Sequence, residues 1–167
     1  MEAQASNGQQ LILSEEVFHG IGTILDEMAV NTRADAIVFC ESNGYPILHK
    51  GYVADLDLSA FSSLAANNFS ATSKMASMLG ESDSFKYLFH EGEKKNIYLS
   101  NVGFNFILLV IFKKDVALGM IRVYTKKAMQ ELHKLLNSVK AEDDTEEFLD
   151  LEFKKLLNEE VNNALNF

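Results

Sequence analysis

The fold is decided by a serine- and alanine-rich stretch in the middle of the chain, residues 57–80, which reads DLSAFSSLAANNFSATSKMASMLG. Asp57 can supply an N-cap oxygen, and Gly80 suits the left-handed residue that ends a helix, so the stretch predicts a single helix. On a helical wheel, one broad and mostly apolar arc is expected to face the core. Its members are Leu58, Phe61, Leu64, Ala65, Phe69, Thr72, Met75 and Leu79.

The opposite arc of this helix consists of small or uncharged residues, with Lys74 as its only charge. A helix face left in water normally carries several charges. The arc fits either a solvated serine-rich helix or a second packed face, at which small side chains let another backbone approach closely. We favour the second interpretation and predict a homodimer seam here. The arc contains Ser59, Ser62, Ser63, Ala66, Asn67, Ser70, Ser73, Lys74 and Ser77.

The segments before this helix predict one helix and a hairpin. Ser14 is a plausible N-cap, and the apolar residues Val17, Phe18, Ile21, Leu25 and Met28 recur at helical spacing as far as about residue 31. Strand-forming residues at 36–41 and 47–53 flank an Asn-Gly dipeptide at 43–44, which suits a tight hairpin turn. Because proline cannot donate to a strand ladder, Pro46 is expected at the start of the second strand or on an exposed edge.

Three further strands and a last helix are predicted after the central helix. Residues 85–90 alternate, with Phe85, Tyr87 and Phe89 on one face, and residues 97–102 form the next strand. The seven apolar residues 106–112 indicate a central strand buried on both faces. A long amphipathic helix begins near Leu118. Because short connections join the strands, we expect an α+β fold in the order α-β-β-α-β-β-β-α, with a mainly antiparallel five-stranded sheet covered by helices on both faces.

Composition predicts a cytoplasmic globular protein of one domain plus extensions. The chain has 167 residues, 47% of them hydrophobic, and its single cysteine excludes an internal disulfide framework. No apolar run is long enough to span a bilayer. Of the net charge of −9, −7 belongs to residues 141–167, and the nearly neutral body offers no basic face for nucleic acid or an anionic membrane. We therefore expect neither as a partner.

No catalytic, metal or cofactor motif appears in the sequence, so no enzyme activity and no cofactor are predicted. The four histidines are far apart and lack metal-ligand spacing. Gly20 and Gly22 lie in a helical pattern before the first strand, whereas a dinucleotide fingerprint must follow a strand. Cys40 lies in an apolar strand, where an inert core thiol is the expected role.

The arrangement over residues 14–140 resembles the roadblock family, the small domains of dynein light chains and of bacterial MglB-like regulators of Ras-like GTPases. The resemblance rests on the order of elements, on the Ser/Ala-rich central helix, and on the run FILLVIF at 106–112 followed by LGMIR at 118–122. It implies a homodimer in which central helices and neighbouring strands of two chains pair, with Tyr87 and Phe89 beside the seam. This pairing would join two five-stranded sheets into one. It also implies a small GTPase as partner, in processes such as cell polarity and motility.

Two classes of function remain open at this stage. The first is a non-enzymatic dimeric regulator or scaffold that binds a Ras-like small GTPase, with stimulation of GTP hydrolysis as a further hypothesis. The second is a longin- or PAS-like sensory or scaffold module that binds a peptide or small molecule. The first is favoured, since no polar residues are set apart for a ligand cavity. The chain has only two arginines, Arg33 and Arg122, and neither is expected to act as an arginine finger.

The two ends of the chain are expected to be extensions of the domain. Residues 1–13 are mostly polar and are predicted to be disordered. Residues 141–167 predict an acidic linker followed by an amphipathic helix. Its stripe serves either to fold back on the body or to capture a partner, and both alternatives stay open. The stripe consists of Leu149, Phe153, Leu156, Leu157, Val161, Ala164 and Leu165.

Overall fold

The computed structural model describes residues 13–81 and 84–140. The elements are α1 (Glu15–Thr32), β1 (Ala36–Glu41), β2 (Pro46–Gly51), α2 (Leu58–Met78), β3 (Tyr87–His90), β4 (Lys95–Gly103), β5 (Phe106–Lys113) and a final helix over 118–140. The predicted order of helices and strands is confirmed. The predictions for residues 1–12 and for the acidic linker and apolar stripe within 141–167 lie outside the described residues.

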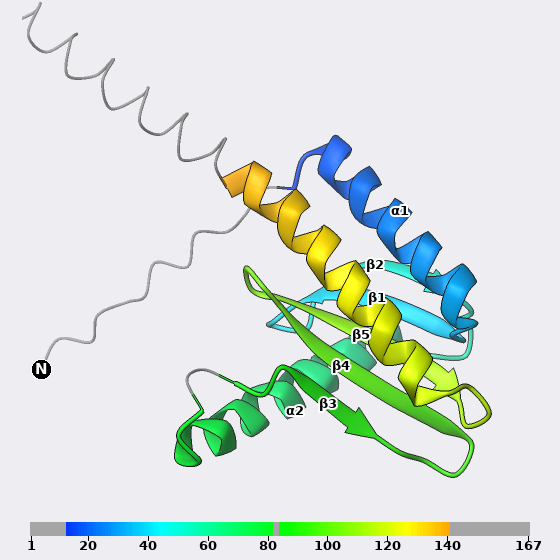
Figure 1. The fold of residues 1–167 in the computed structure, drawn as a ribbon, viewed down its shortest axis with the longest axis vertical. Helices are drawn as coiled ribbons and strands as arrows, with labels where there is room; N and C mark the ends of the chain where they lie inside the picture. Colours follow the sequence, from blue (N-terminus) through cyan, green and yellow to red (C-terminus); the bar gives the residue numbers. More distant parts are fainter. Residues whose placement is uncertain (1–12, 82–83, 141–167) are drawn as a thin grey trace, which may run out of the picture.

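The five strands form one sheet in the order β2-β1-β5-β4-β3, and every neighbouring pair is antiparallel. The strands β2 and β3 therefore lie at the two edges (Figure 1). Pro46 opens β2, as predicted for a residue that cannot donate to a ladder. The strand β5 lies between β1 and β4, and its residues Phe106 to Phe112 are all buried, which confirms a central strand covered on both faces.

One face of the sheet is covered by α1 and the 118–140 helix, which lie side by side in Figure 1. The periodic residues Val17, Ile21, Leu25 and Met28 of α1 are buried there, whereas Phe18 is 43% exposed and does not join them. The core on this face also takes alternate residues of the central strands. From β1 and β5 these are Ile37, Phe39, Phe106, Leu108, Val110 and Phe112.

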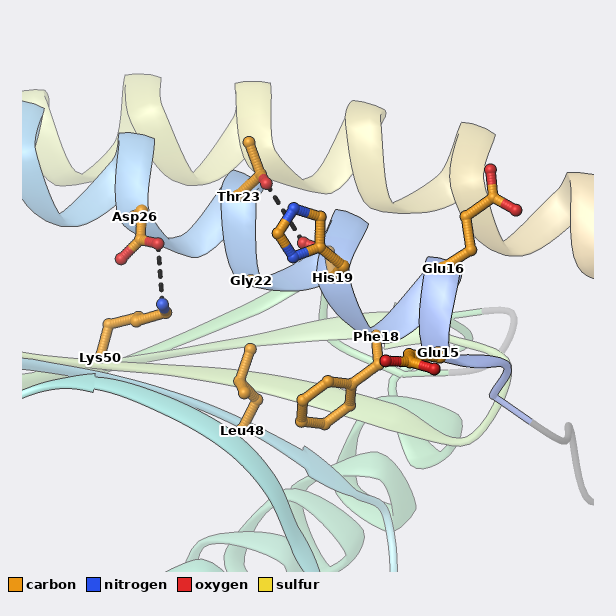
Figure 2. A pocket seen from close by; sticks show the side chains of 9 residues that line it. All are labelled: Glu15, Glu16, Phe18, His19, Gly22, Thr23, Asp26, Leu48 and Lys50. Carbon is orange, nitrogen blue, oxygen red and sulfur yellow. Dashed lines mark hydrogen bonds and ion pairs between the residues drawn. The ribbon is translucent and has the colours of Figure 1, made fainter.

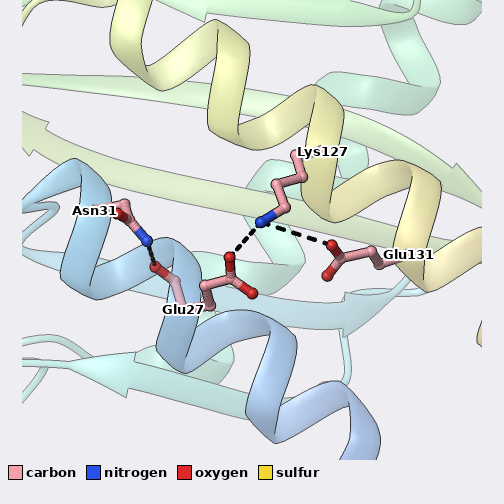
Figure 3. Close-up of polar contacts among 4 residues, drawn as sticks. All are labelled: Glu27, Asn31, Lys127 and Glu131. Atoms are coloured by element: carbon pink, nitrogen blue, oxygen red, sulfur yellow. Dashed lines mark hydrogen bonds and ion pairs between the residues drawn. The ribbon is translucent and has the colours of Figure 1, made fainter.

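The two helices on this face approach closely and are also linked by surface charges. A Cβ on Gly20 would lie 2.9 Å from Leu135 Cδ2, so this glycine lets α1 pack tightly on the 118–140 helix. Lys127 forms an ion pair with Glu27 of α1 and a longer one of 3.9 Å with Glu131 (Figure 3). These side chains are substantially exposed, so the apolar contacts hold the pair together far more than the charges do.

The opposite face of the sheet is covered by α2 alone (Figure 1). Its core consists of Val38, Cys40, Ala65, Ala66, Phe69, Leu99, Ile107 and Leu109. The β1–β2 turn contacts this helix directly, because a Cβ on Gly44 would lie 2.5 Å from the backbone Cα of Ser63. Gly44 has a φ of +93°, and its amide donates to the Glu41 carbonyl at 2.8 Å, which confirms the predicted Asn-Gly turn.

Candidate functional site

Acidic, histidine and cysteine side chains do not gather into a metal-binding group in the part of the chain that the structure describes. Within 13–81 and 84–140, no group of three or more histidine, cysteine, aspartate or glutamate side chains is placed to hold a metal ion. His133 is bound to the backbone carbonyl of Val102. Among the described helices, none combines the length and the apolar composition that crossing a bilayer requires.

Cys40 is an inert core thiol, as the sequence predicted. Its side chain is fully buried beneath α2, and its S–H group donates to the Ile107 carbonyl at 3.7 Å. Burial raises the pKa of the Cys40 thiol from 9.0 to about 12, and the neighbouring Glu41 carboxylate adds to the shift. Almost no thiolate is therefore present at neutral pH, and the thiolate is the nucleophilic form.

The helix α2 is rotated relative to the orientation that its sequence suggested. Ser62, Ala65, Ala66, Phe69 and Ala76 are the buried residues of α2. The predicted seam residues Ser62 and Ala66 thus face the chain's own sheet, and their assignment to an exposed seam is wrong for the protomer. The small side chains do permit a close approach, but the approaching backbone includes the β1–β2 turn at Gly44.

The same rotation leaves long apolar side chains of α2 in solvent. Leu64 is 69% exposed, Met75 58% and Leu79 74%, although all three were predicted to face the core. Met78, at 87%, joins them. The remaining predicted seam residues are exposed, except Ser63 and Ser73, which are half-buried; the exposed ones are Ser59, Asn67, Ser70, Lys74 and Ser77. The exposed surface of α2 therefore mixes small polar residues with large apolar ones.

The edge strand β3 carries the two aromatic residues that were assigned to the interface. Tyr87 and Phe89 lie on one face of the strand, as the alternation predicted, with Tyr87 stacked on Tyr98 at 5.5 Å and Phe89 on Phe112 at 6.3 Å. They remain 39% and 37% exposed. Both belong to the face that α1 and the 118–140 helix cover, while Leu88 packs on the α2 side. Tyr87 and Phe89 therefore lie at the β3 edge on the sheet face opposite α2, whereas Ser63 of the predicted α2 seam lies against the β1–β2 turn.

A groove of about 260 Å³ lies between α2 and the strands β3 and β4. Leu64 and Asn68 of α2 line it together with His90 of β3 and Ile97 of β4. Sequence reasoning missed His90 and Asn68, and it assigned Leu64 to the core. The useful signal was the set of alanines and serines at 62, 65, 66 and 76, because an arc made mostly of small side chains, with Phe69 as its one large member, can lie close to a sheet.

Neither arginine is positioned as a finger that would be inserted into the active site of another protein. Arg33 is the C-cap of α1 in the left-handed conformation, with a φ of 54°, and its amide donates to the Ala29 carbonyl at 3.1 Å. This confirms the predicted capping role, while Asp35 pairs with Lys95 instead. Arg122 lies beside Tyr98. Burial raises the pKa of Tyr98, and the Arg122 guanidinium opposes that rise.

Comparison with known proteins places this arrangement in a family. A family model described as the Roadblock/LC7 domain matches residues 21–112, which is more than half of the chain. The chain belongs to the Roadblock/LC7 family. The resemblance inferred from the sequence is therefore confirmed, and the Roadblock/LC7 match runs from α1 through β5.

Solved structures similar to this chain include three MglB proteins. Myxococcus xanthus MglB is 33% identical, with a TM-score of 0.72 over 77% of this chain and 96% of that one. An MglB with a tetrameric arrangement is 23% identical with a TM-score of 0.71, and the gliding protein MglB of Thermus thermophilus is 24% identical with a TM-score of 0.70. Each of these two also covers 77% of this chain and 96% of its own length. The last two similarities establish the shared fold.

Proposed function

We propose that this protein is a non-enzymatic homodimer that binds a Ras-like small GTPase and regulates or scaffolds it. Family membership supports the GTPase partner, since MglB-like Roadblock/LC7 folds generally bind small GTPases and generally act as non-catalytic regulators. The observation that carries the dimer is the apolar surface on α2 next to the free β3 edge.

The β3 edge suits pairing with a second copy of the chain. Within the described residues, β3 pairs only with β4, so its other edge is free to accept and donate backbone hydrogen bonds. Two β3 strands related by a twofold axis can pair antiparallel and join two five-stranded sheets. Such pairing brings the two grooves beside α2 together, so that Leu64 and its apolar neighbours on α2 lose contact with water.

Any stimulation of GTP hydrolysis is expected to act through the partner's own catalytic residues. An inserted arginine stabilises the transition state directly and accelerates hydrolysis by about 10³-fold or more. The backbone of Arg33 ends α1, its side chain forms no ion pair with an acid among the described residues, and Arg122 lies against Tyr98. The mechanism that remains is positional, in which the bound dimer orders the GTPase's switch loops around the nucleotide.

The test combines binding and turnover for a purified Ras-like GTPase from the same organism. We expect binding that depends on whether GDP or GTP is loaded. In a single-turnover assay, Arg33→Ala and Arg122→Ala should each leave any stimulated rate within a few-fold of wild type. A loss of about 10³-fold for either variant would contradict the positional mechanism. Absence of binding in both nucleotide states at tens of micromolar would contradict the GTPase assignment.

Three further variants separate the role of the dimer from the role of residues 144–167 in the same assay. Leu64→Arg adds a charge to the exposed α2 surface, and Val30→Arg is its matched control, because Val30 is a 78% exposed aliphatic residue on α1. Leu64→Arg should lose GTPase binding together with dimer formation, and Val30→Arg should keep both.

A truncation after residue 143 tests whether the 149–165 stripe captures the partner. In that case GTPase affinity falls while the melting temperature holds, whereas a stripe that folds back on the body lowers the melting temperature.

A further inference from the structure

A second open groove lies at the other edge of the sheet, where α1 overhangs β2. It has a volume of about 740 Å³ and is lined by one side of α1 together with Leu48 and Lys50 of β2 (Figure 2). Leu48 and Lys50 are two residues apart on the strand, so both point toward α1. The groove is separated from the proposed dimer edge by the three other strands of the sheet.

The floor of this groove is apolar, and one of its lining residues is a glycine. Phe18 is 43% exposed there, the one periodic residue of α1 that the core does not take up, and Leu48 is half-buried. Between them, Gly22 contributes no side chain. A Cβ at Gly22 would lie 3.6 Å from Leu48 Cδ2, an ordinary contact distance, so the glycine does not serve to relieve a clash and the groove keeps the space that a side chain there would occupy.

The rim of the groove is acidic. Its charged residues are Glu15, Glu16, Asp26 and Lys50, which leaves a net charge of −2. Lys50 is engaged with Asp26 at 2.7 Å. Glu15 and Glu16 form no ion pair within the described residues, and they lie in the first turn of α1, where the helix dipole favours negative charge. A ligand that brings positive charge is therefore favoured over a neutral or negative one.

The backbone beside this groove is also available. Within residues 13–81 and 84–140, β2 pairs with β1 alone, so the side of β2 away from β1 has no partner strand. An edge of this kind accepts an extended peptide by strand addition, in which backbone hydrogen bonds provide affinity and pockets for alternate side chains provide specificity. The pocket between α1 and β2 lies on the sheet face next to this unpaired side of β2.

We propose that this groove binds an extended, basic segment of a partner protein as a sixth strand beside β2. An apolar side chain of that segment lies between Phe18, Gly22 and Leu48. Lysine or arginine two residues away on the same face of the strand reaches Glu15 and Glu16. The chain's own residues 141–167 carry nine acids against two lysines and are repelled by this rim. Because the groove and the β3 edge are independent, one homodimer presents two such sites.

The test uses the full chain and a peptide with the required pattern, acetyl-SKTLTKS-amide, in which two lysines flank a leucine on one face of a strand. Binding is measured by backbone amide NMR shifts and by fluorescence anisotropy of a labelled peptide. We expect the shifts to concentrate on residues 15–26 and 46–51. The peptides SETLTES and SKTSTKS, which lack the charge or the apolar group, should bind more weakly by about fivefold or more.

Matched variants locate the interaction. Glu15→Gln with Glu16→Gln should weaken SKTLTKS about fivefold, whereas Glu91→Gln with Glu93→Gln, an exposed acidic pair on the β3–β4 turn, should leave affinity within twofold. Gly22→Leu fills the groove and should weaken binding about tenfold or more, and Gly119→Leu, in open space on the 118–140 helix, should not.

Three results would overturn the proposal. They are shifts confined to residues 141–167, equal binding of SETLTES, or full affinity in Gly22→Leu. Light scattering in parallel reports the mass of each variant. An unchanged mass separates failure of this groove from failure of the proposed dimer, since the two lie at opposite edges of the sheet.

Discussion

The two faces of the sheet differ in how completely their apolar side chains are buried. On one face, α1 and the 118–140 helix together enclose a large buried cluster, and their main apolar positions, such as Leu25 and Leu132, have no exposed surface. On the other face, α2 alone covers a cluster less than half that size, while Leu64, Met75 and Met78 stay more than half exposed. A helix that turns small residues inward and long apolar residues outward gains less from its own sheet than it could.

This difference supports the proposed dimer, in which a second copy of the chain covers the α2 face. A buried leucine on the two-helix face stabilises the folded single chain through the hydrophobic effect. An exposed leucine on α2 gives this stabilisation only when another molecule covers it. The adjacent β3 edge lacks a partner strand within the described residues, so unpaired backbone and uncovered apolar surface occur together. Such a combination favours association with another chain, and in the proposed dimer a second copy covers both surfaces at once.

Matched leucine truncations give the largest expected contrast between the two faces. Leu132→Ala removes a fully buried side chain from the two-helix core and should lower the free energy of unfolding by about 3 kcal/mol. Leu64→Ala should change the stability of the monomer by less than about 0.5 kcal/mol. Chemical denaturation over a range of protein concentrations measures both. A large loss for Leu64→Ala even at the lowest concentration would mean that the α2 surface is already closed within one chain.

The buried Cys40 thiol beneath α2 makes the stability of the α2 face depend on pH. The pKa of Cys40 is raised in the folded state, so the native protein keeps its thiol proton at pH values where the unfolded chain has lost it. Its stabilising contribution is fully present below pH 9.0 and is lost as the pH rises toward about 12. Relative to Cys40→Ala, wild type should lose about 1.4 kcal/mol per pH unit in this window.

Thiol labelling of Cys40 then asks whether α2 opens less when two chains associate. If a second copy covers α2, the labelling rate at constant pH should fall as protein concentration rises, because the dimer stabilises the closed form. The unfolded protein supplies the maximal rate as a reference. A labelling rate that is independent of concentration would break the link between the α2 face and association.

Removing the N-cap side chains of α1 and α2 is expected to give the smallest difference between the two faces. Ser14 accepts a hydrogen bond from the Val17 amide at 3.3 Å in α1, and Asp57 accepts one from the Ala60 amide at 3.0 Å in α2. Alanine at either position should cost about 1 kcal/mol, as measured by thermal or denaturant unfolding. Because α2 has fewer tertiary contacts to hold it, Asp57→Ala should also speed local exchange of the α2 amides. Equal exchange in α2 and α1 would argue that the two faces are equally stable.

The sequence was sufficient for the fold because the decisive patterns were local. The apolar run 106–112, the Asn-Gly turn and the capped helices each restrict the backbone over a few residues, and short connections then leave few topologies. The orientation of α2 was not predictable from its wheel. Two arcs compete for the sheet there, one without charge and one with Lys74 alone, and the observed orientation includes a close approach of Gly44 to Ser63, which lie in segments separate in the sequence.

The candidate sites were predictable only in part, for a related physical reason. Tyr87 and Phe89 followed from strand alternation, but which edge of the sheet β3 would occupy required the strand order. Likewise, Phe18 belongs to the apolar pattern of α1, and its exposure depends on how far α1 extends over the edge strand β2. Surfaces made by two elements depend on tertiary geometry, which no single periodic pattern contains.

The mass of the wild-type protein in solution tests the central claim most directly. Static light scattering coupled to size exclusion, at micromolar concentration, should give about twice the 18.7 kDa of one chain. Leu64→Arg should shift the mass toward a single chain, because it places an unpaired charge in the α2 surface, and Val30→Arg should not. A wild-type mass of one chain throughout the micromolar range would contradict the claim that the α2 face and the β3 edge are completed by a second copy.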